Sequence, residues 1–498
     1  AAKTIHMKGL IYSFLSVISM VFINEALGQK NSDSFISKED LKHIQIIEHN
    51  LTPVFILKGA TYEKTIPQMM KEDNVPGLSI AFVDNGKIAW TKCYGYANLE
   101  DSIKVTPETV FLSASLSKPV TAMAALHMVE KKILNLDEDV NITLKGWKIP
   151  VTENTLNQKV TLRRLIGHTA GVMEKDKVFI GYDTSEAVPT VEQILKGEEP
   201  SKDSAVYIEF EPGTRRTYSN AGYLVIQELM TDVTGKSFPD LIDEIVLKPS
   251  MMLQSSFEQP IPQSLMTQKA VGYSSAGEAM EYNIYPFMAP AALWTTPSDL
   301  GRFMMTLLND FEGKSSVILT GNMMKQVLDK RDERLGFSKI YWGNDVLFRH
   351  TGSNDGFNSY MVGSANKKQA LIIMTNSENG FTLIDAIQRA VAKEYQWEYL
   401  KPEELKKQEI LISTLRQYSG QYKIGATTFE FEVQNNKLYV RIKEINDKFL
   451  ETIPVGEHAF LLASKPLKFV FQKGINSEME KLHITDNKAD ISIAVRIK

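Results

Sequence analysis

Several features that the sequence lacks limit its possible folds and functions. It contains a single cysteine, Cys93, among 498 residues, so no disulfide can form within the chain. It has no H-E-x-x-H pattern and no cysteine–histidine spacing typical of metal sites, so we expect neither a metal ion nor another cofactor. Lysine and arginine are scattered without a basic stripe and the formal net charge is −4, which argues against nucleic-acid binding.

Long apolar runs are also scarce, and the one near the N-terminus predicts a leader. Residues 1–6 precede an internal Met7 and are interpreted as a remnant of cloning. Residues 9–23 carry no charge but are shorter than the ~20 residues that span a bilayer. Small residues at 26–28 suit a signal peptidase, so we expect cleavage after Gly28 and a periplasmic or secreted product without an integral membrane domain. An uncleaved membrane anchor is the alternative.

What the sequence does contain is a serine and a lysine at a chemically useful spacing. Ser115 and Lys118 lie three residues apart where an apolar helical pattern begins, and residues three apart share a helix face. A serine hydroxyl is a poor nucleophile until a neighbouring base takes its proton, and an amine in a desolvated pocket can do so. Pro119 is tolerated only in the first turn of a helix, which places Ser115 at the start. An ordinary helix start is the alternative interpretation.

A second S-x-x-K tetrad, from Ser364 to Lys367, shows how weak the pattern is by itself. It occupies a polar stretch between the apolar runs 360–362 and 370–374. We predict that this tetrad is a hairpin turn without chemistry.

Two further motifs follow Ser115 in order along the chain. Tyr218-Ser219-Asn220 opens a second helical pattern, and His350-Thr351-Gly352 follows a strand-like run and precedes Ser353. Taken one at a time, each has a structural explanation: a packed tyrosine, a helix-capping asparagine and a strand histidine. Their order is what favours a shared site.

In this order the three motifs resemble the signatures of the penicillin-recognising serine hydrolases, which include DD-peptidases, class A and class C β-lactamases and related esterases and D-aminopeptidases. The resemblance covers about 74–394, including the stretches 75–81, 165–171, 220–223 and 292–300. The Y-x-N motif is nearer to the class C branch. Class C β-lactamases carry K-T-G, however, whereas H-T-G matches the carboxypeptidase, D-peptidase and esterase branch.

The resemblance implies a mechanism of acyl transfer. Ser115 would form an acyl-enzyme, and Lys118 and Tyr218 would form the base system, with either as the proton acceptor. Asn220 would hydrogen-bond Lys118 and the substrate amide. His350, Thr351 and Gly352 would form the opposite wall, and the oxyanion would lie between the N–H groups of Ser115 and Ser353. His168 is interpreted as structural, fixing a turn by hydrogen bonding.

Three functional hypotheses follow, each with a small molecule or peptide as substrate or ligand. The first is a serine hydrolase acting on D-amino-acid peptides, in the manner of a DD-carboxypeptidase, or on carboxylic esters. The second is a class C-type β-lactamase, which the histidine of H-T-G disfavours. The third is a non-catalytic penicillin-recognising sensor or cell-wall binding protein. The oligomeric state is left open.

Periodicity predicts the architecture of the first domain, 37–400. Strand-like runs at 78–83 and 88–94 are joined by Asn85-Gly86, a strong hairpin signal. Strand-like runs return at 346–350, 360–363 and 370–375, with helical patterns between the two groups and a closing helix over 381–397. Residues 40–70 are predicted to be largely helical. The resulting fold class is α+β, one antiparallel sheet flanked by helices.

A second domain is predicted at 410–498, after a charged, helix-prone linker at 401–408. Here apolar residues alternate with period two in short runs separated by turn residues, which is typical of a small β-barrel or sandwich. Residues 418–422 resemble the opening of the lipocalin-like domain that many members of the superfamily carry. We therefore expect a C-terminal all-β, barrel-like domain without catalytic residues.

Overall fold

The structure is a computed structural model, and its described residues exclude the predicted leader. They are 36–60, 62, 64–175, 180–330, 334–425, 427–443, 448–462, 467–474, 478–485 and 491–497, so residues 1–28 and their predicted cleavage lie outside them. Helix α2 (Lys38–His49) lies mostly in a separate compact unit that ends at Glu48. Ser37 begins it by accepting a hydrogen bond from the Asp40 N–H. Among the described helices, none combines the length and the apolar run needed to cross a bilayer.

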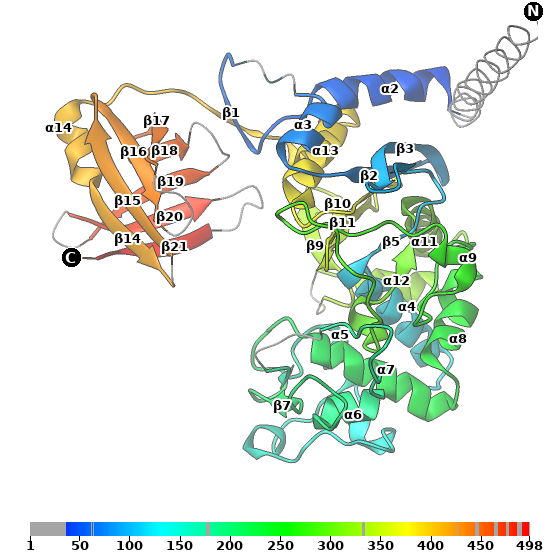
Figure 1. Ribbon diagram of the computed structural model, residues 1–498. Coiled ribbons are helices and arrows are strands. Elements are labelled where there is room, and N and C mark those ends of the chain that lie inside the picture. Colours follow the sequence, from blue (N-terminus) through cyan, green and yellow to red (C-terminus); the bar gives the residue numbers. More distant parts are fainter. Residues whose placement is uncertain are drawn as a thin grey trace, which may run out of the picture. The chain divides into compact units, whose positions relative to one another are not determined.

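A seven-stranded antiparallel sheet organises the first domain (Figure 1). Strands from early and late in the sequence meet at its centre, where β2 pairs with β12 and Ile80 lies opposite Ile373. The predicted hairpin at Asn85-Gly86 is confirmed, and both residues have the positive φ that this turn requires. The order across the sheet is β4 (Ile103–Lys104), β3 (Lys87–Asn98), β2 (Gly77–Asp84), β12 (Gln369–Thr375), β11 (Phe357–Ser364), β10 (Asp345–Asn354) and β9 (Ser338–Trp342).

Helices cover both faces of this sheet. Helix α11 (Pro297–Phe311) approaches closely through Gly301, next to Val83 and Ile372. Helix α13 (Gly380–Glu394) covers the other face, and Tyr395 just after it stacks on Phe82, the neighbour of Val83 in β2. Because successive strand residues point to opposite faces, the two helices lie on opposite sides of the sheet. The predicted fold class, an antiparallel sheet flanked by helices, is confirmed.

The helical part of the domain is built around α4 (Ser117–Glu130), which is buried on almost every side. A helix that is apolar all round belongs in a core, and α4 packs against α10 (Met288–Ala291) and α7 (Asn220–Thr234). One turn of 3₁₀ helix, η1 (Ala114–Leu116), precedes it. The other helices here are α5 (Leu162–Ile166), α6 (Val191–Lys196), α8 (Phe238–Ile242), α9 (Gln263–Met266) and α12 (Gly321–Leu328), whereas α3 (Ile66–Glu72) packs against α13.

Two local predictions were wrong for the same reason. Residues 40–70 are not largely helical, because α2 and α3 are separated by the strand β1 (Phe55–Leu57). The predicted helix-prone linker contains a strand, β13 (Glu403–Leu405), which pairs with β1 in parallel. Each strand pairs with a partner in a distant part of the chain, and the charged Glu403–Leu405 segment has no strand pattern of its own.

The last part of the chain forms a closed barrel of eight antiparallel strands, which confirms the predicted all-β fold (Figure 1). Closure leaves no unpaired edge, since β14 pairs with both β15 and β21. Aromatic rings such as Tyr422, Phe431 and Phe471 fill the interior in edge-to-face pairs. The strands are β14 (Gly420–Ile424), β15 (Thr427–Gln434), β16 (Lys437–Ile442), β17 (Leu450–Gly456), β18 (Ala459–Leu462), β19 (Lys468–Lys473), β20 (Met479–Thr485) and β21 (Ile491–Ile497).

Candidate active site

Ser115 lies in a backbone turn that is held from both sides. Ala114 just before it has a positive φ of 51°, which is costly for a residue with a side chain. Strand β10 packs directly against this turn, and a Cβ added at Gly352 would come within 2.2 Å of the Ser113 carbonyl oxygen. Glycine at position 352 therefore lets the strand that carries His350 approach the Ser115 turn.

Lys118 lies one turn further along, beneath Ser115, and is completely buried. Its Nζ donates hydrogen bonds to Ser115 Oγ (3.0 Å), to Asn220 Oδ1 (2.7 Å) and to the carbonyl oxygen of Pro290 (2.9 Å). Burial lowers the pKa of Lys118 to about 7, and the negative charge of Glu174 acts in the opposite direction. An amine with such a pKa exists in both protonation states near neutral pH.

Tyr218 reaches Ser115 from the other side. Its hydroxyl donates a hydrogen bond of 2.9 Å to Ser115 Oγ, and Lys118 Nζ lies 4.8 Å from the centre of its ring. Although 43% of Tyr218 is exposed, burial of its hydroxyl end raises the pKa to about 12, and the hydrogen bond with Ser115 acts in the opposite direction. Position 218 is set by α7, since Ser219 caps that helix by accepting from the Gly222 N–H.

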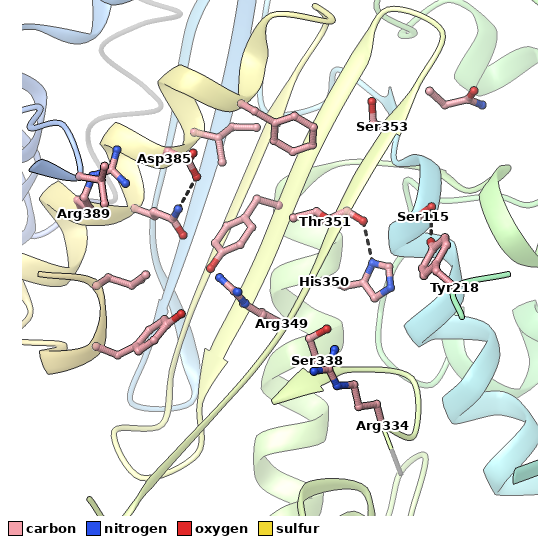
Figure 2. Close-up of a pocket in the computed structure, with 18 of the residues that line it drawn as sticks. Ser115, Tyr218, Arg334, Ser338, Arg349, His350, Thr351, Ser353, Asp385 and Arg389 are labelled. Carbon is pink, nitrogen blue, oxygen red and sulfur yellow. Dashed lines mark hydrogen bonds between the residues drawn. The ribbon is translucent and has the colours of Figure 1, made fainter. Parts of the chain in front are cut away.

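The third motif forms the facing wall. His350 in β10 lies between Thr351 and Tyr218, with its ring centre 6.4 Å from that of Tyr218 (Figure 2). Burial lowers the pKa of His350 to about 3, and the positive charge of Lys118 adds to the effect. Its Nδ1 lies 2.7 Å from the Thr351 carbonyl oxygen, an acceptor, so the neutral ring carries its proton on Nδ1. The Nε2 atom is then left as an acceptor.

Most of the predicted site residues open into one cleft of about 780 Å³. Lys118 and Gly352 are not part of its lining: Lys118 lies beneath the cleft, and Gly352 packs on the turn before Ser115. Figure 2 shows Ser115, Tyr218 and His350 close together, with Ser353 further along β10. The predicted site residues that line the cleft are Ser115, Tyr218, Asn220, His350, Thr351 and Ser353.

His168 has the structural role that the sequence indicates. Its Nδ1 accepts a hydrogen bond from the Ser219 N–H, and its carbonyl oxygen accepts one from the Thr217 N–H. Burial, assisted by the charge of Lys118, holds the pKa of His168 well below its usual value. The imidazole thus stays neutral and keeps an acceptor available to the segment that carries Tyr218.

Three side chains around the site were not predicted from the sequence. Glu174 accepts hydrogen bonds from Asn220, and Arg216 and Arg334 line the cleft. Arg216 lies two residues before Tyr218, and Glu174 lies shortly after the 165–171 stretch, so proximity to a motif was the available signal. Nothing near Arg334 in the sequence points to the site. In the described part of the chain, no three histidine, cysteine, aspartate or glutamate residues are grouped so as to hold a metal ion.

Comparison with known proteins places this geometry in a family. Residues 62–394 match the Beta-lactamase family. Protein flp of Staphylococcus aureus (strain N315) is 25% identical over 381 residues, covering 73% of this chain and 70% of that protein. Penicillin-binding protein 4* of Bacillus subtilis (strain 168) is 24% identical over 437 residues, covering 82% of this chain and 93% of that protein.

A solved structure agrees at the level of the fold. The octameric penicillin-binding protein homologue from Pyrococcus abyssi superposes with a TM-score of 0.56 at 20% identity, covering 86% of this chain and 98% of its own. The family match spans well over half of the chain and contains all three motifs, including both the serine–lysine tetrad and the H-T-G strand. The chain therefore belongs to the Beta-lactamase family of serine hydrolases, which act on amide and ester bonds.

Proposed function

We propose that this protein hydrolyses amide or ester bonds through an acyl-enzyme formed on Ser115. The observation that carries the proposal is that Ser115 Oγ accepts hydrogen bonds from two groups able to handle its proton, Lys118 Nζ and the Tyr218 hydroxyl. A hydroxyl that only caps a helix needs neither. A buried lysine beside it also costs folding free energy, which an ordinary helix start would not require.

Lys118 is the better candidate for the proton acceptor. Burial moves the two pKa values in opposite senses, down to about 7 for Lys118 and up to about 12 for Tyr218. Above neutral pH, a neutral amine is thus available, whereas a phenolate is not. As Ser115 Oγ bonds to the substrate carbonyl carbon, its proton passes to Lys118 Nζ, 3.0 Å away.

The remaining steps follow from the same groups. The oxyanion would be stabilised by the N–H groups of Ser115 and Ser353, two residues that line the cleft. The leaving group would take a proton from the Tyr218 hydroxyl, and Lys118, which holds the proton taken from Ser115 and whose Nζ lies 4.8 Å from the centre of the Tyr218 ring, would return that proton to Tyr218. Water would next attack the acyl-enzyme by the reverse path, giving a free acid and regenerating Ser115.

Charge in the cleft supports a peptide or ester substrate. His350 is neutral, because burial holds its pKa near 3, so it supplies no cation at the position where class C β-lactamases have lysine. The arginines Arg216 and Arg334 line the cleft and can meet a carboxylate elsewhere in the substrate. We therefore favour D-amino-acid peptides, as for a DD-carboxypeptidase, or carboxylic esters over β-lactams, and we retain a periplasmic or secreted location.

The test is covalent labelling followed by turnover. The intact mass of the protein would be measured after exposure to a fluorophosphonate and to a penicillin, the second probe being supported by the name of the Bacillus relative. We expect one adduct on Ser115 with each. Rates on a short ester, a D-Ala-D-Ala peptide, a D-aminoacyl amide and a cephalosporin then separate the hypotheses. If no substrate were hydrolysed and penicillin bound without forming an adduct, the protein would be the non-catalytic binder instead.

A further inference from the structure

Glu174 is a charged residue in the second layer around the site. It follows the short strand β6 (Val172–Met173), is half-buried and lies at the N-terminus of α7. Its Oε1 accepts from the N–H of Asn220 (3.0 Å) and from Asn220 Nδ2 (3.2 Å), and its Oε2 accepts from the N–H of Ala221 (3.0 Å). A carboxylate at this end of a helix is favoured by the helix dipole.

These contacts decide which way the Asn220 amide faces. An ionised carboxylate can only accept hydrogen bonds, so the amide must turn Nδ2 towards Glu174. The opposite end, Oδ1, then faces Lys118 Nζ at 2.7 Å. Turned the other way, the amide would present N–H groups to the lysine and could not accept from it. Glu174, Asn220, Lys118 and Ser115 thus form a continuous hydrogen-bonded chain.

The same carboxylate acts on Lys118 by its charge. Burial favours the neutral form of Lys118, and the negative charge of Glu174 favours the protonated form. The other titratable groups beside this lysine are Tyr218 and Tyr223 from the α7 segment, His168 from the turn after α5 and His350 from β10. Two charged side chains, Arg216 and Arg334, lie near these histidines. Both tyrosines and both histidines are uncharged at neutral pH, because burial raises the pKa values of the former and lowers those of the latter.

We propose that Glu174 is a positioning residue for acyl transfer: it orients the Asn220 amide towards Lys118 and holds a negative charge one side chain away from that amine. The proposal rests on the proposed function, in which Lys118 receives the proton of Ser115. Removing the charge favours the neutral amine, so the proton of Lys118 is lost at lower pH. Losing the amide orientation slows acylation at every pH.

The decisive variant is Glu174→Gln in the full chain, with the rate of fluorophosphonate labelling of Ser115 followed from pH 5 to 10. We expect the inflection to fall by about 0.5–1 pH unit, the size of a charge acting across one side chain. We expect the plateau rate to fall about tenfold or more. Glu174→Asp keeps the charge on a shorter side chain, so it should hold the inflection near the wild-type value while lowering the plateau.

Asp310 provides a matched control. It is a buried carboxylate that accepts from the N–H groups of Val317, Ile318 and Leu319, and it does not line the cleft. We expect both Asp310→Asn and Glu174→Gln to lower the melting temperature, but Asp310→Asn should leave the inflection and the plateau unchanged. Equal effects of the two substitutions, or a Glu174→Gln profile that matches wild type, would overturn the proposal.

A second measurement separates this proposal from the proposed function. Lysine labelled with ¹³C at Cε reports the protonation of Lys118 directly by NMR titration, with the signal assigned by its loss in Lys118→Arg. A lower titration midpoint in Glu174→Gln would support the effect on Lys118 even if wild-type Ser115 were never labelled, an outcome that defeats the proposed function alone. An unchanged midpoint would overturn the role of Glu174. Should Glu174→Gln not fold, a Glu174→Asp protein with an unchanged plateau would contradict the geometric part.

Discussion

The two S-x-x-K tetrads share a spacing and differ in everything that makes chemistry possible. Lys118 is buried and its Nζ reaches Ser115, whereas Lys367 is exposed and approaches Ser364 only through its backbone N–H. Ser364 Oγ donates to Asp345, so its proton is already committed to a structural contact. We therefore expect a catalytic tetrad to differ from a turn in two ways: its amine is buried, and its hydroxyl accepts hydrogen bonds from its neighbours and keeps its own proton free to leave.

The largest expected effect contrasts the two serines. Ser115→Ala should lower kcat/KM for a neutral ester by at least about 10⁴-fold, as nucleophile loss typically does. Ser364→Ala should stay within about twofold of wild type. Steady-state kinetics on both purified variants, with circular dichroism as a check of folding, measures this. A Ser115→Ala enzyme that retains one hundredth of the activity would remove the distinction between the tetrads.

Next in size are the two groups on Ser115 Oγ. Lys118→Ala and Tyr218→Phe should each slow acylation by about 10²–10³-fold, and the double variant should lose little more, because residues that act as a unit are not additive. Lys367→Ala supplies the control from the other tetrad and should have no effect. Pre-steady-state acylation rates of the single and double variants are the measurement. If the loss in the double variant equals the product of the two single losses, Lys118 and Tyr218 work independently.

The pH profile sharpens the role of burial. With a pKa of about 7, Lys118 is protonated below neutrality and cannot accept a proton, so acylation should fall up to about tenfold per pH unit below 7. The acylation rate rises with pH because the neutral form of Lys118 is the base. His350→Gln should keep this inflection, since burial holds the pKa of His350 near 3, outside the range. If the inflection disappeared in His350→Gln, the titrating group would be His350 and our assignment to Lys118 would be wrong.

A smaller effect concerns the wall that faces Ser115. His350→Lys would place a cation where the histidine is neutral, and it should shift preference about tenfold from a neutral ester towards a carboxylate-bearing cephalosporin. The ratio of kcat/KM for the two substrates, in wild type and variant, is the measurement. Wild-type turnover of the cephalosporin equal to that of the ester would contradict our view of the substrate.

The smallest effect is on stability and concerns the second tetrad, Ser364 to Lys367. Ser364→Ala should lower the free energy of unfolding by about 1–3 kcal/mol, because it removes partners from the Asp345 carboxylate and the Lys367 N–H. Urea unfolding would measure it. A loss in Ser115→Ala as large as that in Ser364→Ala would mean that Ser115 has a structural role too.

Features that depend on neighbouring residues could be predicted from the sequence, whereas features that depend on distant segments could not. The order of the three motifs predicted that Ser115, Tyr218 and His350 lie together, as they do in the structure, and Asn85-Gly86 predicted the first hairpin, because each signal lies within a few residues. Glu174 and Arg334 were missed because their importance comes only from what the fold brings beside them. The β1–β13 pair was missed likewise, since its two strands lie in distant parts of the chain and the charged Glu403–Leu405 segment has no strand pattern by itself.

The central pairing of the sheet also constrains how the chain can fold as it is made. Strand β2 is almost entirely buried and needs β12, and Gln369 meets Asp84 across 285 residues. At ~5–20 residues per second, β2 waits about 15–60 s on the ribosome before its neighbour is synthesised. During that time β3, and later α11, can cover β2, but the edge of β2 that pairs with β12 stays open. The first domain therefore cannot complete its sheet vectorially, and its assembly depends on the late arrival of the β10–β12 meander.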